Sequence, residues 1–390
     1  MVELDIGPVA HGGHCVARHQ GRVVFVRHSL PGERVRARIT EAKRGSFCRA
    51  DAIDVLEAAP GRVVAPCEHF HPGGCGGCDF QHASAELQRS LKAAVVTEPL
   101  RRLGGVQMPV TVEELPGTGF GWRTRVRWGV AADGAIGPRV HRSAEVVPIS
   151  QDAPCLIASP GLTALAAELS VEQAADPDDT EEVVLTVAED GSEHVTVPGS
   201  PDVDVIDETV HGRQFAVAAD GFWQVHPAAA EAYVDAVRDF LPPVTGGVAW
   251  DLYGGVGLFA AFLADAVGRT GSVVTVELDR TASALAAANL ADLPQVWHQS
   301  GMVEKVIGTL PSRADVVVLD PPRTGAGKKV CGAIAARSPE VIIYVACDPA
   351  ALGRDTGLLA GLGYRLDRLR AFDAFPQTHH VECIARFVRS

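Results

Sequence analysis

Two residues near the end of the chain, Cys347 and Glu382, have side chains that together can perform covalent catalysis. Cys347 directly follows the apolar run VIIYVA, and Glu382 lies in FPQTHHVECIARF. A thiolate is a strong nucleophile, and a carboxylate beside it can remove a proton later in the reaction. An isolated cysteine after an apolar strand is more often a small buried residue, so its assignment depends on the surrounding pattern.

That pattern is typical of a nucleotide-cofactor domain. The segment DLYGGVGLF follows a strand and opens a helix, and Gly255 and Gly257 allow the backbone to approach a ligand at the helix N-terminus. The next strand ends in VELD, where the Glu277 carboxylate is placed to accept hydrogen bonds from two ribose hydroxyls. A nicotinamide cofactor would use the same geometry, so these residues alone do not identify the cofactor. A thiol and a carboxylate placed after such a domain suggest chemistry on an electron-poor ring.

The elements that must position these residues begin at about residue 210, where strands and helices alternate. Apolar strands are expected at 248–253, 272–279, 315–320 and 341–346, each followed by a helix. Two further strands, 364–375 and 380–389, are expected to close the sheet. The rhythm predicts an α/β fold with a doubly wound parallel sheet, assigned to residues 210–390.

The preceding 209 residues are richer in short strands. Residues 1–60 hold five strand-like segments separated by Gly and Pro, which predicts a small β-barrel of the oligonucleotide-binding type. Residues 61–209 are assigned to a β-rich central domain, with a helix at 84–103, a hairpin at 183–197 and an acidic loop at 176–182. The length of 390 residues suits two or three domains.

Charge is unevenly distributed along the chain. The net charge is −13, yet acids concentrate between residues 152 and 239, while residues 1–60 and 101–142 are rich in arginine. A basic face on an acidic body is compatible with binding a nucleic acid. No signal peptide and no apolar stretch of about 18 residues is found, so we expect a cytoplasmic protein with no membrane partner.

Three cysteines, Cys67, Cys75 and Cys78, crowd together in CEHFHPGGCGGCDFQH. In a reducing compartment such a group binds metal more often than it forms disulfides. Intervening glycines suit an iron–sulfur site, whereas a histidine completing the set would make a zinc site. The candidates for that histidine are His69, His71 and His82.

Taken together, several segments resemble the RNA 5-methyluridine methyltransferase family, and most closely its 23S rRNA uridine-C5-methyltransferases. They are YVACDPAALGRD, DAFPQTHHVE, LDPPRTG, GFWQVHP and, at the front, GGHCVARHQGRVVFVRHSLPGERVRARI, which is similar to the TRAM RNA-binding module. The resemblance implies S-adenosylmethionine as cofactor, Cys347 as nucleophile and Glu382 as base. It further implies cofactor contacts by Gln224, Tyr253 and Asp320.

Methylation of carbon 5 of uracil requires a nucleophile and a base, the roles that the resemblance gives to Cys347 and Glu382. Carbon 5 of uracil is a poor nucleophile, and adding a thiolate at carbon 6 converts the ring to an enolate that is nucleophilic at carbon 5. After methyl transfer a carboxylate must take the carbon 5 proton so that the thiol can leave. Asp348 replaces the family's usual Asn, and we expect its carboxylate to raise the pKa of Cys347 unless a cation such as Arg354 offsets it. His226 likewise replaces an Asn, and Gly254 a Cys.

The resemblance also implies a [4Fe-4S] cluster held by Cys67, Cys75, Cys78 and, as fourth ligand, Cys155, with zinc as the alternative. The leading barrel favours 23S rRNA over tRNA as the target, and we expect a monomer with no protein partner. A tRNA methyltransferase and a non-catalytic iron–sulfur RNA-binding protein are the alternative functions. A 5-methylcytidine enzyme is disfavoured because Cys347 lies in neither a Thr-Cys nor a Pro-Pro-Cys context.

Overall fold

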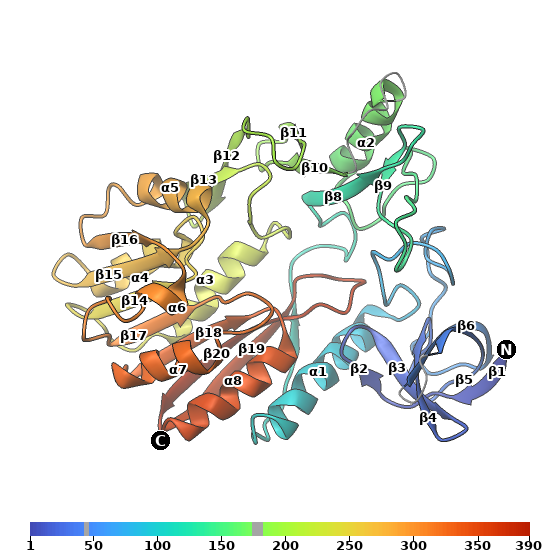
Figure 1. The fold of residues 1–390 in the computed structure, drawn as a ribbon, viewed down its shortest axis with the longest axis horizontal. Coiled ribbons are helices and arrows are strands. Elements are labelled where there is room, and N and C mark those ends of the chain that lie inside the picture. The colour runs from blue at the N-terminus through green and yellow to red at the C-terminus, as the bar shows by residue number, and fades with distance from the viewer. Residues whose placement is uncertain (43–46, 174–181) are drawn as a thin grey trace.

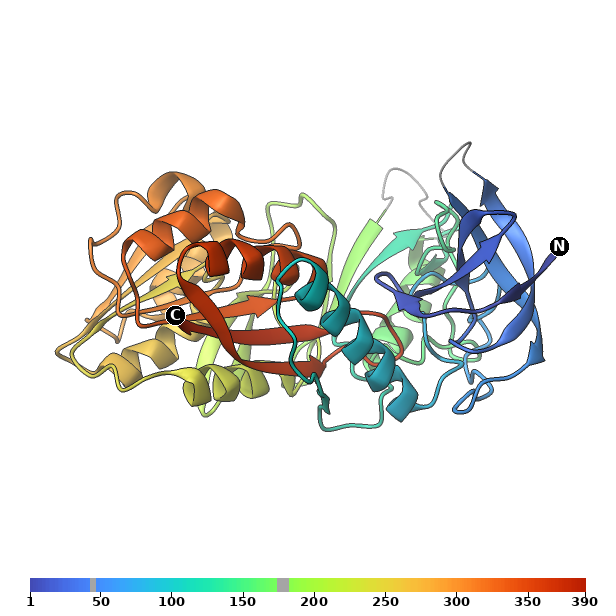
Figure 2. The same ribbon diagram turned by 90° about the horizontal axis from the view of Figure 1, so that it is seen from below.

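The computed structural model describes residues 1–42, 47–173 and 182–390. Nearly all of the acidic loop expected at 176–182 therefore lies outside the described residues. A small β domain at the N-terminus and an α/β domain at the C-terminus lie at opposite ends of an elongated molecule (Figures 1 and 2). A second β-rich region lies between them. Among the described helices, none is long and apolar enough to cross a membrane.

The N-terminal domain is a six-stranded sheet in the order β1-β5-β6-β4-β3-β2. Side chains alternate along β5, so Val35 and Ala37 are buried while Arg34, Arg36 and Arg38 are exposed. The first of the five expected segments divides at Gly7-Pro8 into two strands, which gives six. The strands are β1 (Val2–Asp5), β2 (Val9–Ala10), β3 (His14–His19), β4 (Arg22–Arg27), β5 (Arg34–Ala42) and β6 (Phe47–Glu57).

The central region is built on a four-stranded sheet in the order β11-β10-β8-β9, against which helix α2 packs. The hairpin expected at 183–197 is confirmed, because β10 and β11 pair antiparallel. A separate hairpin, β12–β13, leads into the C-terminal domain. The elements are β8 (Arg125–Val130), β9 (Ile136–Gly137), α2 (Pro160–Gln173), β10 (Glu182–Val187), β11 (Glu193–Thr196), β12 (Val205–Val210) and β13 (Arg213–Ala218).

The C-terminal domain contains an eight-stranded sheet in the order β16-β15-β14-β17-β18-β20-β19-β7. Strands β14 to β18 are parallel, and β20 runs antiparallel beside β18, as expected from the closing strand pair. The strands are β14 (Val248–Leu252), β15 (Ser272–Glu277), β16 (Val296–Ser300), β17 (Val316–Leu319), β18 (Val341–Ala346), β19 (Tyr364–Asp373) and β20 (Glu382–Arg389).

Helices cover both faces of the central parallel strands, which explains why β14, β15, β17 and β18 are mostly apolar. One face packs against α3 and α4, and the other against α7 and α8. The helices are α3 (Ala229–Phe240), α4 (Leu258–Val267), α5 (Arg280–Asn289), α6 (Val303–Val306), α7 (Gly327–Ala336) and α8 (Pro349–Gly361). Strand β16 and helices α3 and α6 are elements that the strand–helix rhythm did not predict.

Two elements from the range assigned to the central domain complete the C-terminal domain. Helix α1 (Ala85–Arg102), which agrees with the helix expected at 84–103, packs alongside α8 (Figure 1). Strand β7 (Val112–Glu114) pairs parallel with β19 at the edge of the sheet. Residues 85–114 therefore belong structurally with the sheet, and the range 61–209 is not one structural unit.

Candidate active site and four-cysteine site

The expected catalytic residues meet at one edge of the C-terminal sheet. Cys347 follows β18 and Asp320 follows β17, so both lie at the carboxyl ends of neighbouring parallel strands. Glu382 begins the antiparallel strand β20, whose register places Cys383 opposite Ala346. Cys347, just after the end of β18, and Glu382, at the start of the adjacent β20, thus lie at the same edge although they are 35 positions apart in the sequence.

The electrostatics of this edge are those of a crowded acidic site. Burial raises the pKa of the Cys347 thiol to about 12, with contributions from Glu382 and Asp320, whereas the charge of Arg323 lowers it. Burial also raises the pKa of Glu382 well above its ordinary value. Its Oε1 atom is buried and has no hydrogen-bond partner within the described part of the chain. Such a group fits a polar or cationic ligand that is bound when the site works.

The glycine loop is organised around two carboxylates. Glu277 Oε2 accepts a hydrogen bond from the Gly255 N–H at 2.9 Å, and its Oε1 accepts one from Asp279 at 2.7 Å. Asp251 is fully buried and accepts hydrogen bonds from the Ala260 N–H at 3.0 Å and the Thr275 hydroxyl at 3.2 Å. Glu277 is thereby aimed across the loop, while Asp251 holds the loop to α4 and β15.

Backbone conformation in this loop is unusual. Gly255 and Gly257 have φ angles of 55° and 93°, in the left-handed region that glycine tolerates, and Tyr253 has a φ of 63°. The Tyr253 hydroxyl donates a hydrogen bond to Glu304 at 2.9 Å. Gln224 is half-buried in the loop between β13 and α3. The structure therefore places the glycines and Glu277 together, with Tyr253 leading into their loop.

Two departures from the family pattern have local explanations. A Cβ atom at Gly254 would lie 2.2 Å from Thr275 Oγ1, so this chain has no room for a side chain there. His226 is buried and stacks on Trp122 with ring centroids 6.1 Å apart. Burial lowers the pKa of His226, and its Nδ1 accepts a hydrogen bond from the Ala228 N–H at 3.2 Å.

The expected effect of Asp348 on the nucleophile needs correction. Its Oδ1 caps helix α8 by accepting a hydrogen bond from the Ala351 N–H at 2.7 Å, and its Oδ2 lies 3.2 Å from His11 Nε2 of the N-terminal domain. The carboxylates that raise the pKa of Cys347 are those of Glu382 and Asp320. The side chain beside Asp348 is that of His11, whose pKa is raised by its hydrogen bond with Asp348, while Arg354 donates instead to the Thr324 carbonyl.

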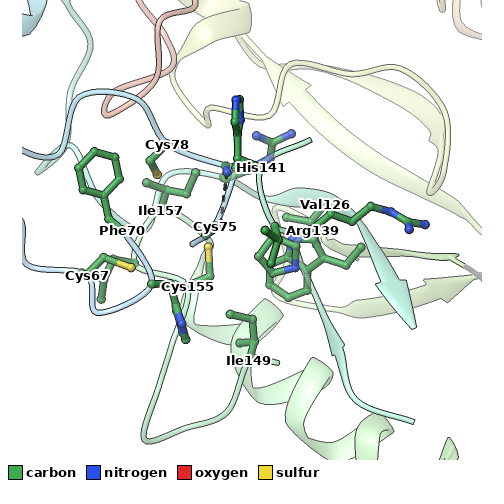
Figure 3. Close-up of a pocket in the computed structure, with 18 of the residues that line it drawn as sticks. Cys67, Phe70, Cys75, Cys78, Val126, Arg139, His141, Ile149, Cys155 and Ile157 are labelled. Atoms are coloured by element: carbon green, nitrogen blue, oxygen red, sulfur yellow. Dashed lines mark hydrogen bonds between the residues drawn. The ribbon is translucent and has the colours of Figure 1, made fainter. Parts of the chain in front are cut away.

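The four cysteines singled out in the sequence line one cavity of about 420 Å³ (Figure 3). All four are free thiols. The fold brings Cys155 to the same cavity as Cys78, although the two are 77 positions apart in the sequence. Burial raises the pKa of Cys75 to about 11, and the charges of Cys155 and Cys67 contribute to that rise. The Gly77 N–H lies 3.3 Å from Cys75 Sγ, as the glycine spacing suggested.

The histidines considered for a zinc site have other partners. His69 Nε2 lies 3.1 Å from the Ala153 carbonyl, His71 Nδ1 lies 3.2 Å from the Pro72 carbonyl, and His82 Nε2 lies 3.4 Å from the Ser29 carbonyl. Within the described ranges, no three His, Cys, Asp or Glu side chains converge closely enough to bind a single metal ion. A cubane cluster has four separate iron corners, so its ligands are spaced more widely than those of one ion.

Several residues at the junction of the three regions escaped the sequence analysis. Lys92 of α1 is fully buried and pairs with Asp373 at 2.5 Å, across 281 positions. Asp79, next to Cys78, binds His379, across 300 positions. No motif or periodicity predicts such pairs, because each residue alone is indistinguishable in the sequence from an ordinary charged residue on a helix or loop.

Two family models and several relatives match the sequence of this chain. Residues 1–53 match the family model for the TRAM domain, and residues 310–389 match the model for tRNA (Uracil-5-)-methyltransferase. An uncharacterized RNA methyltransferase from Streptomyces avermitilis is 44% identical, covering 98% of this chain and 97% of that protein. The 23S rRNA (uracil(1939)-C(5))-methyltransferase RlmD of Alkalilimnicola ehrlichii is 31% identical, covering 99% and 96%.

A solved structure has the same overall fold. The Pyrococcus abyssi tRNA (uracil-54, C5)-methyltransferase, in complex with S-adenosyl-L-homocysteine, superposes with a TM-score of 0.74. It is 22% identical, with 98% of this chain and 99% of that chain covered. Because relatives of 44% and 31% identity cover almost the whole chain, the protein is an RNA methyltransferase. It belongs to the RNA uracil-C5 methyltransferase family, with a TRAM domain at its N-terminus.

Proposed function

We propose that the chain methylates carbon 5 of a uridine in 23S rRNA through a transient bond between Cys347 and the uracil ring. The observation that carries this proposal is the meeting of Cys347, Glu382 and Asp320 at one sheet edge, where each influences the pKa of another. S-Adenosylmethionine, when bound, supplies the methyl group and a positive charge that favours the ionised forms of all three side chains.

The Cys347 thiolate adds to carbon 6 of the ring, and the electrons of the carbon 5–carbon 6 double bond make carbon 5 nucleophilic. Once carbon 5 carries the methyl group, the Glu382 carboxylate takes its proton. The electron pair of that C–H bond re-forms the double bond, and the C–S bond breaks to release the Cys347 thiolate. Arg323 assists, because its charge lowers the pKa of Cys347.

The cofactor contacts follow from the loop geometry. Glu277, aimed by the Gly255 N–H, is placed to accept hydrogen bonds from the ribose hydroxyls. Gly255 and Gly257 would leave the backbone open to the ligand, and the Asp320 carboxylate would hold its cationic end. Gln224 and Tyr253 are the further contacts that we propose.

The four-cysteine site is proposed to hold a [4Fe-4S] cluster. The donor set fits, since four free thiols line one cavity and their charges influence one another. Methyl transfer requires no electron, so the cysteines would serve to fasten the surrounding loops. Zinc is the second and less supported candidate for this site, because His69, His71 and His82 have other hydrogen-bond partners.

The choice of RNA rests on the relatives. The RlmD protein acts on 23S rRNA and has a sequence similar to this chain over almost the full length of both. A tRNA target is the second candidate, because the Pyrococcus abyssi tRNA enzyme also matches this chain over its whole length. Mapping 5-methyluridine in RNA from cells with and without the protein decides between them. If cells without the protein lose 5-methyluridine from tRNA alone, the ribosomal target is excluded.

The covalent mechanism is tested with RNA containing 5-fluorouridine, whose fluorine cannot leave as a cation, so the adduct persists. We expect the protein to form a denaturation-resistant complex with this RNA in the presence of S-adenosylmethionine. Cys347→Ala should abolish the complex and lower turnover at least about a thousandfold. Cys331→Ala, which removes a buried thiol elsewhere in the same domain, is the matched control and should retain the complex. Failure of the unaltered protein to form it would favour a non-catalytic RNA-binding role.

A further inference from the structure

The segment that ends at the candidate base is held by residues from other parts of the chain. Residues 374–381, here called the base loop, connect β19 to Glu382 at the start of β20. The loop reaches from the C-terminal sheet toward the other two regions (Figure 1). Gln377, near its middle, is buried and has a φ of 69°, a strained conformation for a residue other than glycine. Such a conformation persists only where neighbours enforce it.

Helix α1 supplies one set of restraints. The Gln88 side chain forms two hydrogen bonds of 2.9 Å with Gln377, one to its backbone N–H and one to its side-chain oxygen. Lys92 donates a hydrogen bond to the Phe375 carbonyl at 2.9 Å and pairs with Asp373. These contacts fix the first half of the base loop.

The four-cysteine region supplies the second set through Asp79, the neighbour of Cys78. Asp79 Oδ2 accepts a hydrogen bond from the His379 N–H at 2.9 Å and lies 2.6 Å from His379 Nδ1. The backbone N–H groups of Asp79 and Phe80 both donate to the Gln377 carbonyl at 2.9 Å. The half of the loop nearest Glu382 is therefore fastened to the cysteine segment.

Asp79 is in turn fixed by its surroundings. Arg27 of β4 donates a hydrogen bond to the Cys78 carbonyl at 3.1 Å and lies 4.0 Å from the Asp79 carboxylate. Gly13 of the N-terminal domain packs so closely that a Cβ atom there would lie 2.8 Å from Asp79 Cβ. A displacement of the cysteine segment consequently moves Asp79, and with it His379.

We propose that Asp79 and His379 are positioning residues that link the four-cysteine site to the catalytic base, so that an intact cysteine site keeps Glu382 in place. This inference rests on the proposed covalent function. Glu382 acts only after carbon 5 has been methylated, when it takes the proton and the Cys347–carbon 6 bond breaks. Displacing Glu382 therefore slows release of the RNA without slowing formation of the adduct.

The test uses Asp79→Ala, His379→Ala and the double variant of the full-length protein. With ordinary uridine RNA we expect release of methylated RNA to slow by about tenfold or more, since small misplacements of a catalytic group have large effects. Covalent adduct should then accumulate. With 5-fluorouridine RNA, adduct formation should stay within about twofold of the unaltered protein. The double variant should release methylated RNA no more slowly than the slower single variant, because both substitutions remove the same link.

Hydrogen exchange supplies a readout that does not depend on activity. Amides of residues 374–381 should exchange faster in both single variants and in Cys75→Ser, which alters the cysteine site four positions away from Asp79. Unchanged exchange in Asp79→Ala and His379→Ala would overturn the link. So would adduct formation with 5-fluorouridine RNA that falls in parallel with turnover, since that indicates general damage. If the unaltered protein forms no adduct, the proposed function fails, while the exchange measurement still tests the link.

Discussion

The pKa of Asp320 links its protonation state to the binding of a cationic cofactor. Burial, together with the charges of Asp251 and Glu277, raises its pKa to about 7. The free protein therefore holds Asp320 largely protonated in mild acid and ionised in mild base. A cationic cofactor binds the ionised form better, so proton release and cofactor binding are linked.

We accordingly expect affinity for S-adenosylmethionine to rise between about pH 6 and about pH 8, by up to about tenfold per pH unit below the pKa. Asp320→Asn should weaken binding at the upper end and reduce the dependence on pH. Part of the dependence should remain, because burial also raises the pKa of Asp251 to about 7. Calorimetric titration across this range measures the effect. An affinity that is flat with pH in the unaltered protein would contradict this assignment of Asp320.

Asp348 offers a second prediction at the residue scale. Asn is as good a helix cap as Asp, so Asp348→Asn should keep the cap on α8 and lose only the charge that faces His11. Turnover should remain within about twofold of normal or increase, because the acids that raise the pKa of Cys347 are Glu382 and Asp320. A large loss of turnover would show that the contact with His11 matters for catalysis.

The comparison variant Asp348→Ala removes the cap as well. It should lower the free energy of unfolding by about 1 kcal/mol, a cost that Asp348→Asn avoids. Thermal unfolding of the two variants separates capping from charge.

At the scale of elements, α1 is bound to the C-terminal sheet through a buried ion pair. Lys92 and Asp373 are both buried, and the Lys92 ammonium also binds the Phe375 carbonyl. Removing one partner leaves the other charged and unpaired in the interior. The attachment of α1 should therefore be sensitive to a single substitution.

Lys92→Met should lower the free energy of unfolding by about 3–5 kcal/mol, measured by denaturant titration. Adding Asp373→Asn should recover part of that loss, since the unpaired charge disappears. The matched control is Arg102→Met, which breaks an exposed ion pair with Glu98 on the same helix. It should lower the free energy of unfolding by about 0.5 kcal/mol or less. Equal losses for Lys92→Met and Arg102→Met would show that the buried pair contributes little.

The sequence predicted elements well where the pattern was local. The alternation after residue 210 correctly indicated β14, β15, β17 and β18, which are buried along almost their whole length, and also the closing pair β19 and β20. Strand β16 was missed because its residues, VWHQS, are partly exposed at the sheet edge. Strand β7 was missed because three residues carry no readable period, and its partner is about 260 positions away.

The residues of the candidate site also fall into those that a local pattern predicts and those that depend on tertiary packing. Cys347 and Glu277 were indicated by their positions at strand ends and Glu382 by its resemblance to the family's base motif, and the structure brings these residues to one edge. The link from Asp79 to His379 depends on how two loops from different regions meet. Such a meeting is determined by tertiary packing, which no local pattern encodes.

At the scale of the whole molecule, the cysteine site lies at the junction of three regions. Its residues come from the segment after the N-terminal domain and from the loop before α2. A metal cluster there would add a cross-link between segments that are otherwise joined by hydrogen bonds, such as that of the His69 side chain with the Ala153 carbonyl. The protein without metal should consequently be less stable as well as less active.

Cys155→Ser tests this site, because it removes the ligand most distant in sequence. We expect purified protein to contain iron and acid-labile sulfide with a broad visible absorbance, and the variant to lose both. Its melting temperature should fall by several degrees. Zinc in place of iron would favour the second candidate, and metal-free protein of unchanged stability would exclude a structural metal. Cys48→Ser, a buried thiol of the N-terminal domain, is the control for a lost cysteine.

The insertion of β7 at the outer edge of the sheet has a consequence for synthesis on the ribosome. Glu113 pairs with Arg370 across 257 positions, so α1 and β7 emerge long before the strand and helix that receive them. The six strands of the TRAM domain pair with one another within the first sixty residues, so this sheet can form while translation continues. The C-terminal sheet must instead wait until β19 and β20 have been synthesised. A C-terminal fragment that begins after residue 114 would leave β19 as a bare edge strand, prone to associate with other chains.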